Sequence, residues 1–444
     1  MVKFAQMPKY ETYKDSGVKW LGEVPKEWEV KRLKNVATLN PASRFSTKEL
    51  KNMACFLPME KVGVDGKVDF SIQKPIKDLI SGFTSFNKND VILAKITPCF
   101  ENGKGALLNE MPTDRGFGST EFHVLRAIYN NVPKYLYYLT KTDLFMKLGE
   151  SLMTGSAGQK RVQSSFVTGF QFACPCSVKQ SLIANFLDQK TAQIDAAIAI
   201  KEQQIELLKE RKQIIIQQAV TQGLDPNVPM KDSGVEWIGQ IPEHWEIKRL
   251  KYVLKERNER SRTGEEPLLM VSQIHGLVVR SDYHSKAEVA ASNIDNKIVY
   301  KNDLVFNKLK AHLGVFFKSN IDFQGLVSPD YAVYKCDKYI VDSKYLELLF
   351  RHPSYIAQFI IRATGIVEGL IRLYTGDLFD LPIPVASKKE QTEILMFLEE
   401  HSKDFDRAIG LQQQQIQKLK EYKTTLINSA VTGKIKITPE MLQA

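Results

Sequence analysis

Apolar residues recur at alternating steps of three and four along two long segments of the chain. The steps pass through Leu187, Ile194, Ile198, Ile205, Leu208 and Ile215, and again through Leu398, Phe405, Ile409, Ile416, Leu419 and Leu426. This spacing is typical of the a and d positions of a coiled coil. Polar residues interrupt both series at equivalent steps, which favours pairing of the two helices in one register. We therefore predict an antiparallel coiled coil.

The alternative is two unrelated amphipathic helices, each packed on a core of its own. The length of the pattern argues against it. From Leu187 to Ala219 such a helix spans roughly 50 Å at about 1.5 Å per residue. A helix of that length with a narrow apolar stripe needs a partner of equal length, and the second segment supplies one.

Segments outside these two helices are also repeated in the sequence. The segment "KDSGVKWLGEVPKEWEVKRLK" of residues 14–34 returns as "KDSGVEWIGQIPEHWEIKRLK" in residues 231–251, and "NDVILAKITP" from Asn89 returns as "NDLVFNKLKA" from Asn302. Such repeats indicate a duplicated architecture with a pseudo-twofold axis. The predicted parts are a first lobe (1–178), a helix (179–223), a second lobe (224–386), and a helix with a C-terminal tail (387–444). The same symmetry predicts neighbouring chain termini.

Each lobe shows both strand and helix patterns, so the predicted fold class is α+β. Alternating apolar residues in 91–96, 121–127 and 330–335 predict strands. Apolar positions three and four apart predict one amphipathic helix per lobe, in 133–152 and 343–361. The Gly-containing segments 154–161 and 364–372 follow these helices and are expected to be loops.

Charge is unevenly distributed along the chain. The net charge of the 444 residues is +10, whereas residues 179–221 carry +1 and residues 387–431 carry none, which leaves +9 for the remainder. Basic lobes favour a polyanionic partner. The chain shows no apolar run of membrane-spanning length and no signal peptide, and its five cysteines are scattered, so we expect a cytoplasmic protein with reduced thiols and no membrane partner.

Catalytic motifs are largely missing. The glycines of 102–106 and 154–161 do not form a nucleotide loop, and the seven histidines lack metal-ligand spacing. One alternative remains: Asp330, Asp342 and Lys344 have a spacing found in metal-dependent nucleases, where two carboxylates bind a divalent ion beside a lysine. The first lobe does not keep this set, so a strand edge and a helix cap are the simpler interpretation.

Basic and amide side chains beside strand ends are better candidates for binding. Lys and Arg neutralise phosphates, while Arg, Lys, Asn and Gln read base edges. We predict DNA contacts at Lys95, Thr97, Asn102, Lys104, Arg115, Ser156, Gln159, Lys160 and Arg161 in the first lobe, and at Asn307, Lys308, Lys310, His312 and Arg372 in the second. The second loop lacks the Ser, Gln and Lys of the first, so the lobes are expected to bind different sequences.

The doubled Trp segment, together with the helix entries "KQSLIANFLDQKTAQID" and "KEQTEILMFLEEHSKDFD", resembles the specificity subunit of type I restriction–modification enzymes over nearly the whole chain. The resemblance implies two target-recognition domains separated by two helical spacers, and a non-catalytic subunit that reads an asymmetric bipartite site in double-stranded DNA. It further implies two methyltransferase (modification) subunits and restriction/translocase subunits as partners. S-adenosylmethionine, ATP and Mg are then expected on those partners, with no cofactor on this chain.

The four tryptophans belong to the repeated segment. We interpret Trp20, Trp28, Trp237 and Trp245 as packing anchors that join each lobe to the foot of the helix pair, and not as residues that stack on bases.

Overall fold

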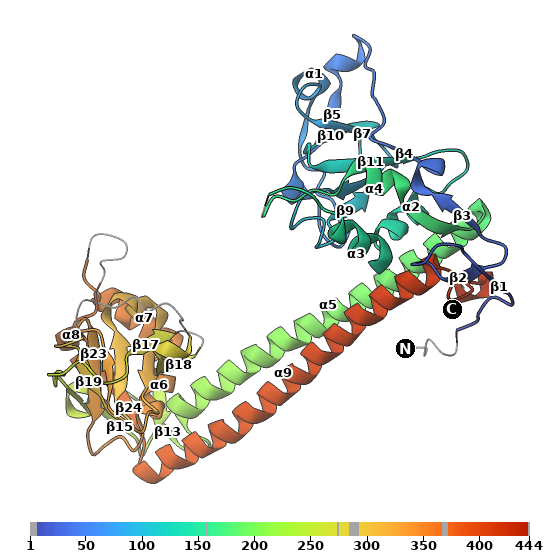
Figure 1. Cartoon of the computed structure of the whole chain (residues 1–444). Helices are drawn as coiled ribbons and strands as arrows, with labels where there is room; N and C mark the ends of the chain where they lie inside the picture. Colours follow the sequence, from blue (N-terminus) through green and yellow to red (C-terminus); the bar gives the residue numbers. More distant parts are fainter. Residues whose placement is uncertain (1–6, 157, 273–274, 284–292, 366–371, 443–444) are drawn as a thin grey trace. The chain divides into compact units, whose positions relative to one another are not determined.

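A computed structural model describes residues 7–156, 158–272, 275–283, 293–365 and 372–442. It confirms the α+β class (Figure 1). The chain divides into two compact units. The first unit comprises residues 1–202 and 413–444, and the second comprises residues 203–412. Each unit therefore contains one lobe and a part of both long helices.

The first lobe holds two four-stranded sheets. One is antiparallel and consists, in spatial order, of β4 (Ala37–Leu39), β11 (Phe122–Ala127), β8 (Val91–Ala94) and β9 (Gly105–Leu107). The other consists of β6 (Gln73–Pro75), β5 (Met53–Leu57), β10 (Arg115–Gly118) and β7 (Thr84–Asn87), with β5 and β10 parallel. Their apolar faces share one core, in which Leu57 and Phe86 pack with Ile92 and Val124.

The second lobe repeats this arrangement. Its antiparallel sheet consists of β16 (Leu254–Glu256), β23 (Tyr331–Cys336), β20 (Leu304–Asn307) and β21 (Phe316–Lys318). Two strand pairs stand where the first lobe has its second sheet: β17 (Leu269–Ser272) with β18 (Gly276–Val279), and β19 (Lys297–Val299) with β22 (Gly325–Val327). A parallel bridge between Leu268 and Leu326 joins the two pairs. The strand order is thus common to both lobes.

Shorter elements connect each lobe to the helices. The strand pairs are β1 (Tyr13–Asp15) with β2 (Glu23–Pro25), β3 (Glu29–Arg32) with β12 (Gln171–Cys174), β13 (Met230–Asp232) with β14 (Gln240–Pro242), and β15 (Glu246–Arg249) with β24 (Pro382–Val385). The short helices are α1 (Ile76–Leu79), α4 (Ser164–Gly169) and α8 (Thr375–Phe379). The 3-10 turns are η2 (Leu33–Asn35), η3 (Glu49–Lys51), η4 (Met59–Lys61), η5 (Leu250–Tyr252), η6 (Arg280–Asp282), η7 (Lys308–Leu313) and η8 (Pro439–Leu442).

The amphipathic segment of each lobe is two helices, so the prediction of a single helix was wrong. The pairs are α2 (Pro133–Thr140) with α3 (Asp143–Ser151), and α6 (Ser343–Leu349) with α7 (Pro353–Arg362). The break has a local cause in both copies. Thr142 and His352 adopt extended backbone and accept the hydrogen bond of an N–H group in the new first turn. They act as N-caps, so each restarts a helix instead of continuing one.

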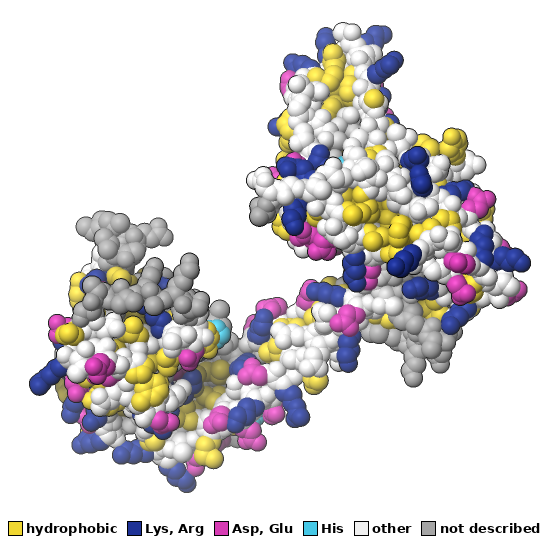
Figure 2. Space-filling view, viewed as in Figure 1, with side chains coloured by type: hydrophobic (Ala, Val, Ile, Leu, Met, Phe, Trp, Pro, Cys, Tyr) yellow, Lys and Arg dark blue, Asp and Glu magenta, His cyan; other side chains and the backbone are white. Residues whose placement is uncertain are grey.

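The long helices are α5 (Ser177–Gln222) and α9 (Lys388–Val431). In the first unit Asp195 accepts from Lys423 at 2.6 Å while Lys201 donates to Gln415, so the residue numbers run in opposite directions and the pair is antiparallel. In the second unit Lys212 donates to Asp406 at 2.7 Å. Along the predicted apolar series Leu208, Ile215, Phe405 and Ile409 are half-buried and the other positions are buried. Figure 2 shows acidic and basic side chains interleaved on the outer surface of the pair.

The repeated Trp segments pack where a lobe meets the helices. Trp28 and Trp245 are fully buried, and Trp237 packs edge-on against Tyr355 with ring centroids 4.9 Å apart. These three confirm the interpretation as anchors, but Trp20 is 47% exposed and is not one. Trp20 lies in a surface turn between β1 and β2, which explains its exposure.

The ends of the long helices pack on the same tryptophans. Gly433 follows α9 with φ +75°, and a Cβ added to it would lie 2.6 Å from Pro25 and 3.2 Å from Trp28. Gly223 follows α5 with φ +80°, and its Cβ would lie 3.5 Å from Trp245. Glycine is therefore required at Gly433 both for the left-handed backbone and for the close approach.

The described ends of the chain lie side by side in the first unit (Figure 1). The Lys436 N–H donates to the Pro8 carbonyl at 2.8 Å, and the Tyr13 hydroxyl donates to the Gly433 carbonyl at 3.2 Å. The prediction of neighbouring termini is therefore confirmed.

Candidate nucleic-acid interface

Three segments of the first lobe meet at one edge of its antiparallel sheet. The segment that leaves β8 bonds to the loop of residues 154–161: the Thr97 N–H and hydroxyl both donate to the Lys160 carbonyl, at 3.0 and 2.9 Å. The Val162 N–H donates to the Lys95 carbonyl at 2.8 Å. The turn before β11 joins them, because the Lys95 N–H donates to the Glu121 carbonyl at 2.9 Å. Most of the predicted first-lobe contacts lie on this surface.

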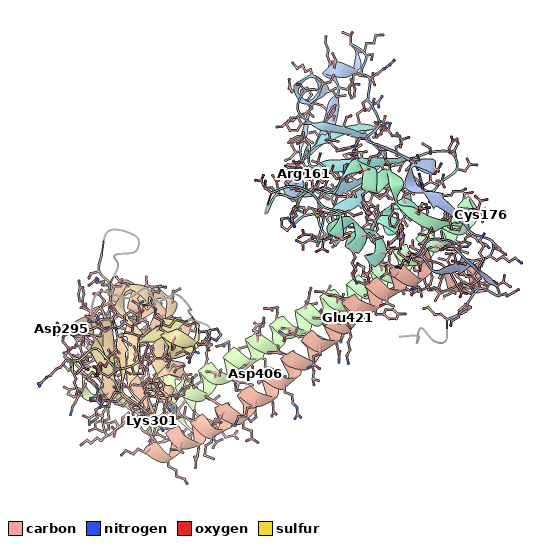
Figure 3. All side chains as sticks on the ribbon, viewed as in Figure 1. Arg161, Cys176, Asp295, Lys301, Asp406 and Glu421 are labelled. Atoms are coloured by element: carbon pink, nitrogen blue, oxygen red, sulfur yellow. The ribbon has the colours of Figure 1, made fainter. Side chains whose placement is uncertain are left out.

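Arg161 lies at the centre of this meeting point (Figure 3). Its Nε donates to the Glu121 carboxylate at 3.0 Å and its Nη2 at 2.9 Å, while Nη1 donates to the Gln159 carbonyl at 3.3 Å. The hydrogen bond from Arg161 holds the pKa of Glu121 below its usual value, and the same bond raises the pKa of Arg161. The guanidinium is fixed in direction, although 41% of the side chain is exposed.

The other polar groups of this surface are more accessible. The side chains of Lys160, Gln159, Ser156 and Asn102 are exposed, and that of Lys95 is half-buried. The ammonium groups of Lys95 and Lys160 form no ion pair with the part of the chain that the structure describes. Both are available to a phosphate group.

Two predicted contacts have structural partners elsewhere. The Lys104 ammonium donates to the Met59 carbonyl at 3.0 Å. Arg115 donates to Asn87 Oδ1 at 2.9 Å from β10 of the other sheet, and its guanidinium lies 5.5 Å from the centre of the Phe45 ring. The structure places Arg115 away from Lys95 and Arg161. The Lys104 carbonyl accepts from the Ala94 N–H at 2.9 Å, next to Lys95, but its ammonium is held by Met59.

Sequence reasoning missed Lys141, which follows α2. Its ammonium donates to the carbonyls of Gly103 and Gly105, the latter at 3.2 Å, and lies 5.1 Å from the centre of the Tyr137 ring. Burial lowers the pKa of Lys141 to about 8. The residue holds the turn between β8 and β9 in place. No motif marks it, because its partners are backbone carbonyls.

The second lobe repeats the backbone of this surface. The Leu373 N–H donates to the Lys308 carbonyl at 3.1 Å, as Val162 does to Lys95. Arg372 pairs with Asp330 at 3.4 Å, at the position of Arg161 and Glu121. Lys308 lies 3.8 Å from Glu256, and Asn307 accepts from the Leu309 N–H at 3.0 Å.

Two other second-lobe candidates are Lys310 and His312. Lys310 is exposed and forms no ion pair among the described residues. The side chain of His312 lies outside the described part of the chain.

Residues 25–210 match the model of the type I restriction modification DNA specificity domain. The type I restriction enzyme EcoAI specificity subunit of Escherichia coli is 41% identical over 145 residues, which are 32% of this chain and 24% of that relative. The match thus spans about a quarter of that relative's length. The MjaVIII specificity subunit of Methanocaldococcus jannaschii is 23% identical over an alignment of 466 positions, which covers 98% of this chain and 99% of that subunit. The chain is thus similar to the specificity subunits of type I restriction enzymes.

A solved structure supports the fold of this chain. A chain from work on complex assembly and conformational transition of the type I R-M system superposes with a TM-score of 0.69 at 17% identity, over 92% of this chain and 98% of the other. The fold shared with that chain includes both lobes and the antiparallel helix pair, whose helices α5 and α9 each follow one lobe along the sequence.

The three residues of the nuclease alternative have structural roles in this chain. Asp342 is the N-cap of α6 and accepts from the Lys344 N–H at 2.8 Å. Lys344 pairs with Glu347 at 2.7 Å, and Asp330 pairs with Arg372. Within the described ranges no group of three His, Cys, Asp or Glu side chains could hold a metal ion. Nor is any described helix both long enough and apolar enough to cross a membrane.

Proposed function

We propose that this chain selects the DNA target of a type I restriction–modification complex and performs no catalysis itself. The observation that carries the proposal is one backbone frame that occurs twice with different side chains. Each lobe brings a strand-end segment and a loop together, by the bonds from Val162 to Lys95 and from Leu373 to Lys308. The loop sequences differ, since residues 154–161 read "TGSAGQKR" and residues 364–372 read "TGIVEGLIR".

Two different readers imply an asymmetric target in two parts. Lys95 and Lys160 supply positive charge for phosphates, and exposed Gln159 and Asn102 can bond base edges. Half-sites read from one face of B-DNA lie about 34–36 Å apart, or a multiple of that distance. We infer that the helix pair sets the spacing between the half-sites.

The chemistry belongs to partners in this proposal. Two modification subunits would methylate adenine with S-adenosylmethionine, and restriction/translocase subunits would use ATP and Mg. The complex would act on double-stranded DNA in the cytoplasm. This division of labour agrees with a chain in which sequence reasoning finds no catalytic motif.

The test is methylome sequencing of cells that express this chain with its cognate modification subunit. We expect one adenine-methylated motif in two unlike parts. Exchange of residues 1–178 for those of another specificity subunit should change one part and leave the other. An assembled complex that leaves the genome unmethylated would contradict the proposed function.

A further inference from the structure

An acidic side chain lies at the centre of the surface proposed to bind DNA in each lobe. Glu121 directly precedes β11, and Asp330 directly precedes β23. A carboxylate repels phosphate groups, so a surface that only neutralised the DNA backbone would be stronger without it. Because the acid occurs at the same position in both repeats, its role must lie in what it does to the neighbouring arginine.

The geometry of Arg161 shows that role. A guanidinium carries five N–H donors in a rigid fork. In Arg161, Glu121 takes one donor on Nε and one on Nη2, and the Gln159 carbonyl takes one on Nη1. Two donors remain, one on each terminal nitrogen. They belong to a side chain that cannot rotate without breaking three hydrogen bonds.

A fixed pair of donors suits a base edge better than a phosphate. Guanine offers O6 and N7 in the major groove, and an arginine fork bonds both. A phosphate needs only positive charge, and the Glu121 carboxylate has already balanced that of Arg161. Unpaired Lys95 and Lys160 on the same surface meet the phosphate requirement. Within one lobe, charge and base reading are thus divided between different side chains.

The second lobe places a different acid beside the equivalent arginine, joined to it by a single ion pair. The Thr364 and Arg372 backbones exchange hydrogen bonds of 2.9 and 2.8 Å, as Thr154 and Arg161 do at 3.1 and 2.8 Å. Arg372 Nη2 then lies 3.4 Å from Asp330 Oδ1. Both arginines therefore occupy the same position opposite the threonine that begins their loop. Each side chain extends toward the acid that directly precedes β11 or β23.

We propose that Glu121 and Asp330 are specificity-determining residues, each of which orients its arginine to read a guanine in one half of the DNA target. The inference rests on the proposed function, because it assigns base contacts to a surface taken to bind DNA. It adds a residue type, an acid, that charge alone would exclude from such a surface.

The experiment is selection of bound sequences from a randomised double-stranded library by the full chain in complex with its modification subunit. Four variants are compared with the unsubstituted chain: Glu121→Gln, Arg161→Lys, Asp330→Asn and Glu399→Gln. Arg161→Lys keeps the charge but removes the fork. Glu399 pairs with Lys403 on the exposed face of α9, so Glu399→Gln is the matched control for loss of a lysine-paired or arginine-paired carboxylate.

Glu121→Gln and Arg161→Lys should each lower the preference for guanine at the same position of one half-site, by about five- to a hundredfold. Asp330→Asn should do so in the other half-site, and Glu399→Gln should change neither. Glu121→Gln should also bind random DNA more tightly, with the slope of log K against log salt steeper by about 0.9, because it releases one positive charge.

The inference would be overturned by a folded Arg161→Lys complex that selects the same motif as the unsubstituted chain in both halves. This holds even if Glu121→Gln does not fold. If the complex of the unsubstituted chain selects no motif at all, the proposed function itself is overturned.

Discussion

Lys179 occupies the position in the first repeat that Glu390 occupies in the second. Both lie in the first turn of a long helix, and both pair with the residue that precedes a buried tryptophan. Lys179 pairs with Glu27, whereas Glu390 accepts from His244 at 2.9 Å. The polarity of the pair is therefore inverted between the repeats. A first lobe docked on α9 would place the Glu27 carboxylate beside that of Glu390, so the inversion favours the native pairing.

The inversion also predicts a stabilising double substitution. Glu390 accepts the indole N–H of Trp245 at 2.9 Å, but Lys179 has only donors, and the indole N–H of Trp28 finds no acceptor within the described residues. Glu27→His together with Lys179→Glu reproduces the pair of His244 and Glu390 in the first unit. Satisfying the buried N–H should stabilise the protein by about 0.5–1.5 kcal/mol in chemical denaturation. Lys179→Glu alone should be less stable than the double variant, because it faces Glu27 with a second carboxylate; the reverse order would contradict this explanation.

A second prediction concerns the bidentate pair of Arg126 and Asp90, with bonds of 2.8 and 2.7 Å. Asp90 is almost fully buried and also accepts from the Asn87 N–H at 2.7 Å. Asp90→Ala should cost about 3–5 kcal/mol, because it leaves the cation and the N–H without a partner. The cost of Arg126→Ala with Asp90→Ala together should be smaller than the sum of the two single costs. Additive costs in urea denaturation would show that the pair is not coupled.

Two leucines of α9 offer a matched test of the helix pair. Leu426 is 1% exposed, while Leu411 is 53% exposed. Leu426→Ala should lower the free energy of unfolding by about 2–5 kcal/mol, because it leaves a cavity between packed side chains. Leu411→Ala should change it by less than about 0.5 kcal/mol. Equal effects in thermal melts would argue against burial as the source of the stability.

His123 should make the first lobe sensitive to acid. Its Nε2 donates to the Val162 carbonyl at 3.0 Å, its Nδ1 lies 3.4 Å from the Asn40 side-chain nitrogen, and burial lowers its pKa. The charged groups around it are Lys95 and Glu121. Because the unfolded chain binds a proton near pH 6.5 and the folded lobe does so only at lower pH, this stability is complete above pH 6.5 and is lost as the pH falls below it.

The measurement is urea denaturation between pH 5 and pH 8. His123→Gln should flatten the part of the profile below pH 6.5 relative to the unsubstituted chain. An unchanged slope would assign the acid sensitivity to other groups.

Lys141 gives a prediction about the proposed interface. Lys141→Met should speed amide exchange in residues 103–105, because their carbonyls lose the ammonium donor. Lys147 is exposed on the following helix, so Lys147→Met is the matched control. Exchange that stays slow in Lys141→Met would show that the strands alone hold this turn.

The sequence predicts the large features of the fold because they are periodic or repeated. The steps from Leu187 to Ile215 lie on one helix, and the copied Trp segments reveal the duplicated frame. The breaks at Thr142 and His352 were missed, since the apolar pattern continues across them and only the capping side chains end it. The sheet around β5 was missed because its strands are short.

The candidate site was predicted less completely, for a physical reason. Composition locates basic loops, but a lysine's role depends on partners far away in the sequence. Lys104 is bound to Met59 and Lys141 to Gly105, and neither pairing leaves a trace in local spacing. The acid beside Arg161 is likewise recognisable only when the loop and the strand are seen together.

The division of the chain into units has a consequence for its synthesis. The first unit consists of residues 1–202 and 413–444, so the whole second unit is inserted within it. During synthesis the amino-terminal lobe emerges from the ribosome first, but its unit is complete only after the part of α9 from residue 413 onward has been made. At about 5–20 residues per second, residue 413 follows residue 202 by roughly 10–40 s. The second unit can complete its fold during that interval, while the half of α5 in the first unit still exposes its apolar stripe.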